Sequence, residues 1–197
     1  MNGLVVLVLL VLLAGGYAVS VYNRFVVTRT RLGAAIQEIG NQLKRQHDLI
    51  PNLVGSVRGY FKHEKGIFDK LTEARKAVAA VVDSGDARKL LEASGKLTAA
   101  LTPIRAVFES NPQLQAAGPV SKLMAELSDT ADKIMYSRRL LIDLSADFNA
   151  LVATFPSNLV ARLFGFKAQP GLVIDDQREL VEVEKEETIT PEVKLDS

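Results

Sequence analysis

"LSDTADKIMYSRRLLIDLSADFNALVATFP", residues 127–156, repeats an apolar position every seven residues. The residues at that position are Leu127, Ile134, Leu141, Phe148 and Phe155. A seven-residue repeat keeps one face of an α-helix apolar over several turns, which is typical of helices that pack against other helices, as in coiled coils. This stretch therefore predicts a long helix in a helix-on-helix fold, and Pro156 predicts where that helix ends.

Three upstream segments have the same period near 3.5 residues, and none shows the two-residue alternation of a half-buried strand. The first carries Phe25, Leu32, Ile36, Ile39, Leu43 and Ile50. The second is expected to begin at Pro51 and the third at an N-cap on Asp86, with a kink or irregular turn at Pro103. Short connections favour antiparallel neighbours. The chain is therefore predicted to be all-α, an antiparallel up-down four-helix bundle of long helices.

The segment Gly3–Tyr22 contains twenty residues without a charge, about the length of helix that crosses a bilayer. A cleaved signal peptide is the alternative, but no Lys or Arg precedes the run and the run exceeds the usual signal-peptide core. We expect a single transmembrane helix that continues into the bundle. Arg24, Arg29 and Arg31 follow the span, so the positive-inside rule places the N-terminus outside and the body in the cytoplasm.

The expected organisation has three parts. Residues 1–23 form the transmembrane anchor, and residues 24–167 form the helical bundle. Residues 168–197 carry nine acids against three bases and no stable periodic face, which predicts a flexible acidic tail.

Composition removes several classes of function. The 197 residues contain no Cys, which excludes disulfides, thiolate metal sites and cysteine nucleophiles. A net charge of +1 without a dense basic run argues against nucleic-acid binding. No cofactor motif is present, so no cofactor is expected.

A metal-dependent hydrolase around His47, Asp48, His63 and Glu64 is the enzymatic alternative. The two histidines are sixteen residues apart, and neither has a His, Asp or Glu three or four positions later. Ligand pairs on a helix need that spacing. We therefore expect neither a metal site nor catalytic residues.

Glu64 falls on the apolar stripe of the second predicted helix, where a carboxylate needs a partner. Arg29 and Arg138 are the candidates if the chain turns near Pro51. We interpret Glu64 as part of a buried ion pair that fixes helix register, with a functional carboxylate as the alternative.

The segment "TFPSNLVARLFGFK", residues 154–167, should return to the membrane end of the bundle. Leu163, Phe164 and Phe166, flanked by Arg162 and Lys167, suit a short helix in the headgroup region. The alternative is that the phenylalanines plug the base of the bundle, since both arrangements bury the same residues.

A hairpin turn near Pro51 would lie at the end of the bundle farthest from the membrane. The polar residues around it form the candidate partner-binding tip: Lys44, Arg45, His47, Asp48 and Asn52.

Four sequences carry a family resemblance. They are "VYNRFVVTRTRL" (21–32), "QLKRQHDLIPNLVGSVRGYFKHE" (42–64), "TEAR" (72–75) and "FPSNLVARLFGF" (155–166). In this order behind an apolar helix, over residues 1–167, they resemble the LemA family of bacterial proteins. Gln46 stands where that family often has an additional Arg, which weakens any requirement for a basic triplet there.

The resemblance implies a single-pass membrane protein with a long helical body, no established enzymatic activity and a place in the bacterial cytoplasmic (inner) membrane. We expect an interaction or scaffolding protein whose partners are the lipid bilayer and proteins still to be named, with self-association into a homo-oligomer as one mode. A membrane-surface organiser that shapes lipid through its oligomers is the alternative within the binding class.

Overall fold

A computed structural model describes residues 2–61 and 65–169, and in this part every regular element is helical. The elements are α1 (Asn2–Val57), the 3-10 turn η1 (Arg58–Tyr60), α2 (Lys65–Val81), α3 (Ala87–Ser110), α4 (Pro112–Ala116), α5 (Gly118–Ala153) and α6 (Ser157–Phe164). The all-helical prediction is confirmed. Nearly all of the expected acidic tail lies outside the described residues.

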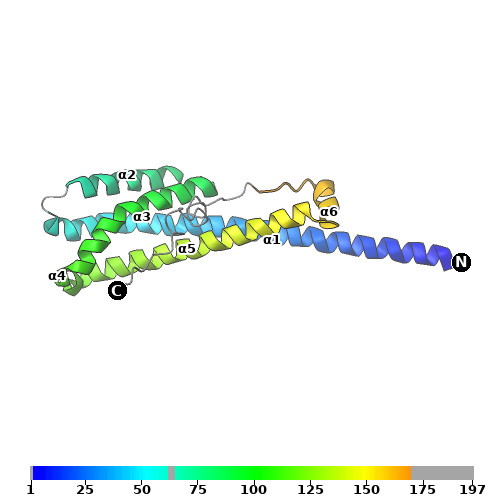
Figure 1. Ribbon diagram of the computed structural model, residues 1–197, viewed down its shortest axis with the longest axis horizontal. Coiled ribbons are helices and arrows are strands. Elements are labelled where there is room, and N and C mark those ends of the chain that lie inside the picture. Colours follow the sequence, from blue (N-terminus) through cyan, green and yellow to red (C-terminus); the bar gives the residue numbers. More distant parts are fainter. Residues whose placement is uncertain (1, 62–64, 170–197) are drawn as a thin grey trace, which may run out of the picture.

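Helices α1 and α5 lie side by side and form the frame of the molecule (Figure 1). They are antiparallel, because Phe25, nearer the N-terminus of α1, contacts Phe148, whereas Gln46, further along α1, contacts Leu127. Each step along α1 is thus matched by one step back along α5. The N-terminal part of α1 extends alone beyond the body (Figure 1).

Helices α2 and α3 form a second antiparallel pair that flanks the half of α1 far from the N-terminus (Figure 1). Gly40 of α1 marks the close approach, since a Cβ there would lie 3.2 Å from the carbonyl oxygen of Val82. Chain direction alternates as predicted, but four helices do not run side by side over the whole length. The expected four-helix bundle is therefore not confirmed.

One apolar core runs between these helices, and Phe25, Ile39, Leu43, Leu97 and Phe148 are among its fully buried members. Each such side chain contributes about 1.5–3 kcal/mol through burial. Polar residues also lie in the core: the Gln46 amide donates a long bond of 3.5 Å to the Leu127 carbonyl, which also accepts from the Thr130 hydroxyl at 2.9 Å.

The seven-residue repeat of α5 is buried at its first four positions, but its fifth position is exposed. Phe148 is 1% exposed, but Phe155 is 79% exposed. The helix ends at Ala153, before Pro156 as predicted, so Phe155 no longer follows the helical period. The prediction that Phe155 belongs to the core stripe was wrong for this reason.

The predicted turn near Pro51 was also wrong, because α1 continues through Pro51 to Val57 and the chain reverses after it. A proline inside a helix has no N–H for the carbonyl four residues earlier, here that of His47. Arg75 of α2 supplies the missing donor, with its Nε 3.1 Å from that oxygen. The tertiary contact thus satisfies the bond that proline removes.

Two other local predictions can be compared directly. Asp86 is the N-cap of α3, since its carboxylate accepts from the N–H groups of Arg88 and Lys89. Pro103 lies inside α3, as expected. The connection between α3 and α5 contains the five-residue helix α4, whose N-cap is Asn111.

Candidate functional site

The first turns of α1 form an apolar rod with no protein around it. Side chains from Leu4 to Leu13 are exposed, and only 6% of the most apolar 18-residue window is buried. By length and composition this helix can cross a membrane. The buried core begins at Val21.

An aromatic cluster closes the body where the bare rod begins. Phe166 stacks on Phe25 with ring centroids 4.5 Å apart and meets the edge of Phe148 at 6.3 Å. Tyr22 contacts Phe164 at 4.7 Å. Helix α6 therefore returns to α1 where the bare N-terminal part of α1 begins, as Figure 1 shows.

The conformation of Gly165 and hydrogen bonds to the backbone of Gln169 hold the chain that follows α6 in place. Gly165 ends the helix in the left-handed conformation, with φ of 72°, which glycine adopts without strain. The Asn149 side-chain amide then bonds Gln169 twice: its Nδ2 donates to the Gln169 carbonyl at 3.0 Å, and its Oδ1 accepts from the Gln169 N–H at 2.7 Å. These bonds hold the segment after α6 against α5.

The three predicted membrane-interface residues have different surroundings. Phe166 packs onto the core, as the plug hypothesis expects. Leu163 and Phe164 are 77% and 52% exposed, so their apolar surface faces away from the body. Contact of these two side chains with a membrane stays a prediction.

The predicted partner-binding tip does not lie at a turn. Lys44, Arg45, His47, Asp48 and Asn52 are all on the continuous helix α1, which runs on for several residues toward the distal end. Arg45 lies 3.6 Å from Glu126 and 3.9 Å from Asp129, and His47 Nδ1 lies 3.0 Å from Asp48 Oδ1. The side chains of Lys44 and Asn52 are exposed. Partner binding at these residues stays a prediction.

The predicted buried ion pair stays a prediction, because Glu64 lies outside the described residues. Of its two candidate partners, Arg29 is exposed on α1. Arg138 is half-buried, and its Nε has no hydrogen-bond partner in the described chain.

The hypothetical metal site cannot be assembled from the described residues. Residues 2–61 and 65–169 contain no group of three or more His, Asp or Glu side chains placed to hold a metal. His63 and Glu64 lie outside these ranges, so the four-residue hypothesis stays untested.

The sequence-based reasoning missed a groove between α1 and α5. It has a volume of about 580 Å³ and lies on the flank away from α2 and α3. It is lined by Ala34, Ala35, Tyr136, Ser137, Leu140 and Leu144, together with the charged residues Arg31, Glu38 and Lys133. Tyr136 is 71% exposed. The available signal was Tyr136 and Leu140 themselves, two large residues of α5 outside the heptad stripe.

Lys133 also shapes the charge at one end of this groove. Its Nζ donates to Asp129 Oδ2 at 2.8 Å, and this bond is the main reason that the pKa of Asp129 is lowered. Lys133 and Arg45 together hold Asp129 from both helices.

With this geometry in view, the comparison with protein families is decisive. The model of the LemA family matches residues 35–184. The chain belongs to the LemA family. The matched region starts within α1 and extends past α6, so the resemblance seen in the sequence is confirmed. It reaches further into the acidic segment than the expected limit at residue 167.

A curated relative of this LemA-family chain is Magnetosome protein MamQ from Magnetospirillum gryphiswaldense. The two are 25% identical over 169 residues, an alignment that covers 74% of this chain and 62% of that protein. The chain thus spans about three-fifths of the length of the relative it matches.

Proposed function

We propose that this chain is a membrane-anchored scaffold whose helical body presents binding surfaces to other proteins. The observation that supports it most is α1, one helix of 56 residues that is a bare apolar rod at its start and a core helix from Val21 onward. An uninterrupted helix transmits its orientation, so the body stands at a fixed angle to the anchor. We assign no catalytic residue and no cofactor.

For orientation we propose an outside N-terminus and a cytoplasmic body at the bacterial inner membrane. Arg24, Arg29 and Arg31 are exposed at the start of the body, on the side of the span that the positive-inside rule assigns to the cytoplasm. Protease treatment of sealed spheroplasts tests this arrangement. A body that resists protease until the membrane is opened supports it, and a body digested in intact spheroplasts contradicts it.

Crosslinking of the full chain in intact membranes tests the scaffold. A lysine-reactive reagent followed by mass spectrometry should give reproducible links from α1, α3 or α5 to defined proteins or to second copies. A matched control carries Leu9→Arg and Leu13→Arg in the span, which should remove the chain from the membrane and abolish those links. An anchored chain that gives no links would refute the scaffold.

A second candidate function is organisation of the lipid surface through α6. The observation that favours it is the exposed pair Leu163 and Phe164, which lies beside Tyr22 at the inner end of the candidate span. Apolar side chains flanked by Arg162 suit the headgroup region of anionic lipid.

Fluorescence quenching by lipids with brominated acyl chains tests this second function. The full chain is reconstituted with a single Trp at position 164 or, as control, at exposed Tyr136 far along the body; the native chain has no Trp. Quenching at position 164 alone supports insertion of α6. Equal quenching at both positions, or none at position 164, contradicts it.

A further inference from the structure

The groove between α1 and α5 is an apolar surface on a part of the body that α2 and α3 leave open. Tyr136 and Leu140 project from α5, whereas Ala34 and Ala35 make the α1 wall low. A large side chain on one wall thus faces a small one on the other. Such a surface can receive the same surface of another copy, large residues against small ones.

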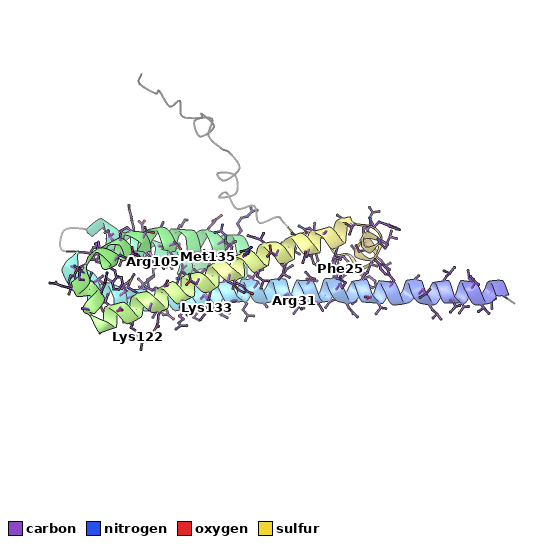
Figure 2. All side chains as sticks on the ribbon, turned by 60° about the horizontal axis from the view of Figure 1, so that its bottom comes forward. Phe25, Arg31, Arg105, Lys122, Lys133 and Met135 are labelled. Atoms are coloured by element: carbon purple, nitrogen blue, oxygen red, sulfur yellow. The ribbon has the colours of Figure 1, made fainter. Side chains whose placement is uncertain are left out.

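The charged residues around the groove are also complementary between the two helices. On α1, Arg31 and Glu38 flank the alanines; on α5, Lys133 and exposed Asp143 flank Tyr136 and Leu140. Residues spaced by three, four or seven positions share a helix face, so each set forms one stripe. Figure 2 labels Arg31 on α1 and Lys133 on α5 along the stretch where the two helices run together.

The antiparallel register sets the height of each charge. Because Phe25 is level with Phe148, Arg31 is level with residue 142, about 1.5 Å along the axis from Asp143. By the same count Glu38 is level with residue 135, about 3 Å from Lys133. Every basic residue on one stripe thus has an acidic residue at its height on the other.

Anchoring limits how two copies can meet. Two chains that enter one bilayer in the same direction are related by a two-fold axis along the membrane normal, so residues at equal heights face each other. Such an axis in front of the groove places α1 of one copy against α5 of the other. Arg31 then faces the partner's Asp143, and Glu38 faces the partner's Lys133. Ala34, which is level with residue 139, faces the partner's Leu140.

We propose that the groove is a dimer seam, in which α1 and α5 of two copies inserted in the same direction form a two-fold symmetric four-helix bundle. Neighbouring helices of this bundle are antiparallel, and α2 and α3 lie on its outside. The inference rests on the proposed membrane anchoring and specifies one partner of the scaffold as a second copy of this chain. Within residues 2–61 and 65–169, Arg31 and Asp143 have no ion-pair partner closer than 4.0 Å, which leaves both available to the second copy.

Cysteine crosslinking can test the seam cleanly, because the chain has no cysteine of its own. Two full-length chains with different tags are co-expressed, one with Ala34→Cys and the other with Leu140→Cys. Oxidation in intact membranes should then give a disulfide that joins the two tags, which no bond within one chain can mimic. The control pair is Gln37→Cys with Met135→Cys, two positions of similar height that lie off the groove.

Charge reversal tests the contact independently. Arg31→Asp should lower the yield of the Ala34→Cys and Leu140→Cys product severalfold, since it sets two acids at one height. Adding Asp143→Arg to the same chains should restore the yield. These changes leave the Lys133–Asp129 pair intact, and helical content by circular dichroism identifies a variant that misfolds.

The outcomes separate this inference from the scaffold. A joined product from the groove pair but not the control pair, with loss and rescue by charge, supports the seam. Product no greater than that of the control pair in an anchored, folded chain overturns it, while links to other proteins would leave the scaffold standing. A chain absent from the washed membrane fraction overturns the anchoring on which both depend.

Discussion

The Nε of Arg75 in α2 lies 3.1 Å from the backbone carbonyl oxygen of His47 in α1. That oxygen would accept from residue 51 in an ordinary helix, but residue 51 is a proline and has no N–H. A side chain from a neighbouring helix therefore takes over a bond of the backbone. The contact also sets the register between α1 and α2.

Removal of this donor should cost stability in a way that depends on Pro51. Arg75→Met keeps the apolar stem and should lower the free energy of unfolding by about 1–2 kcal/mol, because a part-buried carbonyl loses its partner. In a Pro51→Ala background the new backbone N–H can donate to His47, so Arg75→Met should cost less. Unfolding of the full chain in detergent, followed by circular dichroism, gives the four values. Equal costs in both backgrounds would show that Arg75 does not act on this carbonyl.

Phe148 and Phe155 occupy the same position of the seven-residue repeat but should respond oppositely to truncation. Phe148→Ala leaves a cavity in the core beside Phe25 and should cost about 3–5 kcal/mol. Phe155→Ala removes an exposed ring and should change stability by less than about 0.5 kcal/mol. The two variants are measured in one denaturation series, and each serves as the matched control for the other. A large loss for Phe155→Ala would place that ring in a packed contact.

Asp86 should make stability depend on acid pH. Its hydrogen bonds to the N–H groups of Lys89 and Arg88 lower its pKa in the folded chain below the usual value. The stabilisation is thus complete above the unfolded pKa of about 4 and is lost as pH falls through the folded pKa. Asp86→Asn keeps an acceptor at the N-cap but does not titrate there.

Thermal melts between pH 2 and pH 7 measure this effect. The advantage of the native chain over Asp86→Asn should be greatest at neutral pH and shrink below about pH 4. Asp86→Ala removes the cap and should melt lower throughout, by about 2–4 °C at neutral pH. A native advantage that persists unchanged at pH 2 would rule out ionisation of Asp86 as its source.

Insertion of the proposed anchor into the membrane should be prevented by added charge but not by a change in the shape of its apolar side chains. Leu9→Arg with Leu13→Arg introduces two cations one turn apart, each costing about 2.5–3.5 kcal/mol at the centre of a bilayer. The chain should then leave the membrane pellet after an alkaline wash. Leu9→Ile with Leu13→Ile keeps the apolar surface and should stay in the pellet. Retention of the arginine variant would contradict insertion of this segment.

Much of the fold could be predicted from the seven-residue repeat and from the residues that begin or end helices. The repeat through Leu127, Ile134, Leu141 and Phe148 predicted a core helix, and all four side chains are buried. Asp86 and Pro156 predicted a cap and a helix end for local steric and hydrogen-bonding reasons. The uncharged run Gly3–Tyr22 predicted an apolar helix because its length and composition alone define one.

The candidate surfaces were less accessible to sequence. The segment 154–167 returns to the end of the body where the apolar part of α1 begins, as the pattern predicted, but only the ring contacts separated Phe166, on the core, from exposed Phe164. The groove went unnoticed because its walls come from two helices about one hundred residues apart in the chain. No local pattern reports which faces of distant helices remain uncovered.

The sequence by itself determined that the chain is helical, where its apolar segment lies and which stripe of the last long helix is buried, since these follow from local periodicity. Only the tertiary structure decided that α1 passes through Pro51, because the donor that replaces the missing N–H comes from Arg75 in another helix. It likewise decided that Tyr136 and Ala34 line one groove, because the α1–α5 register is set by the sum of contacts along both helices.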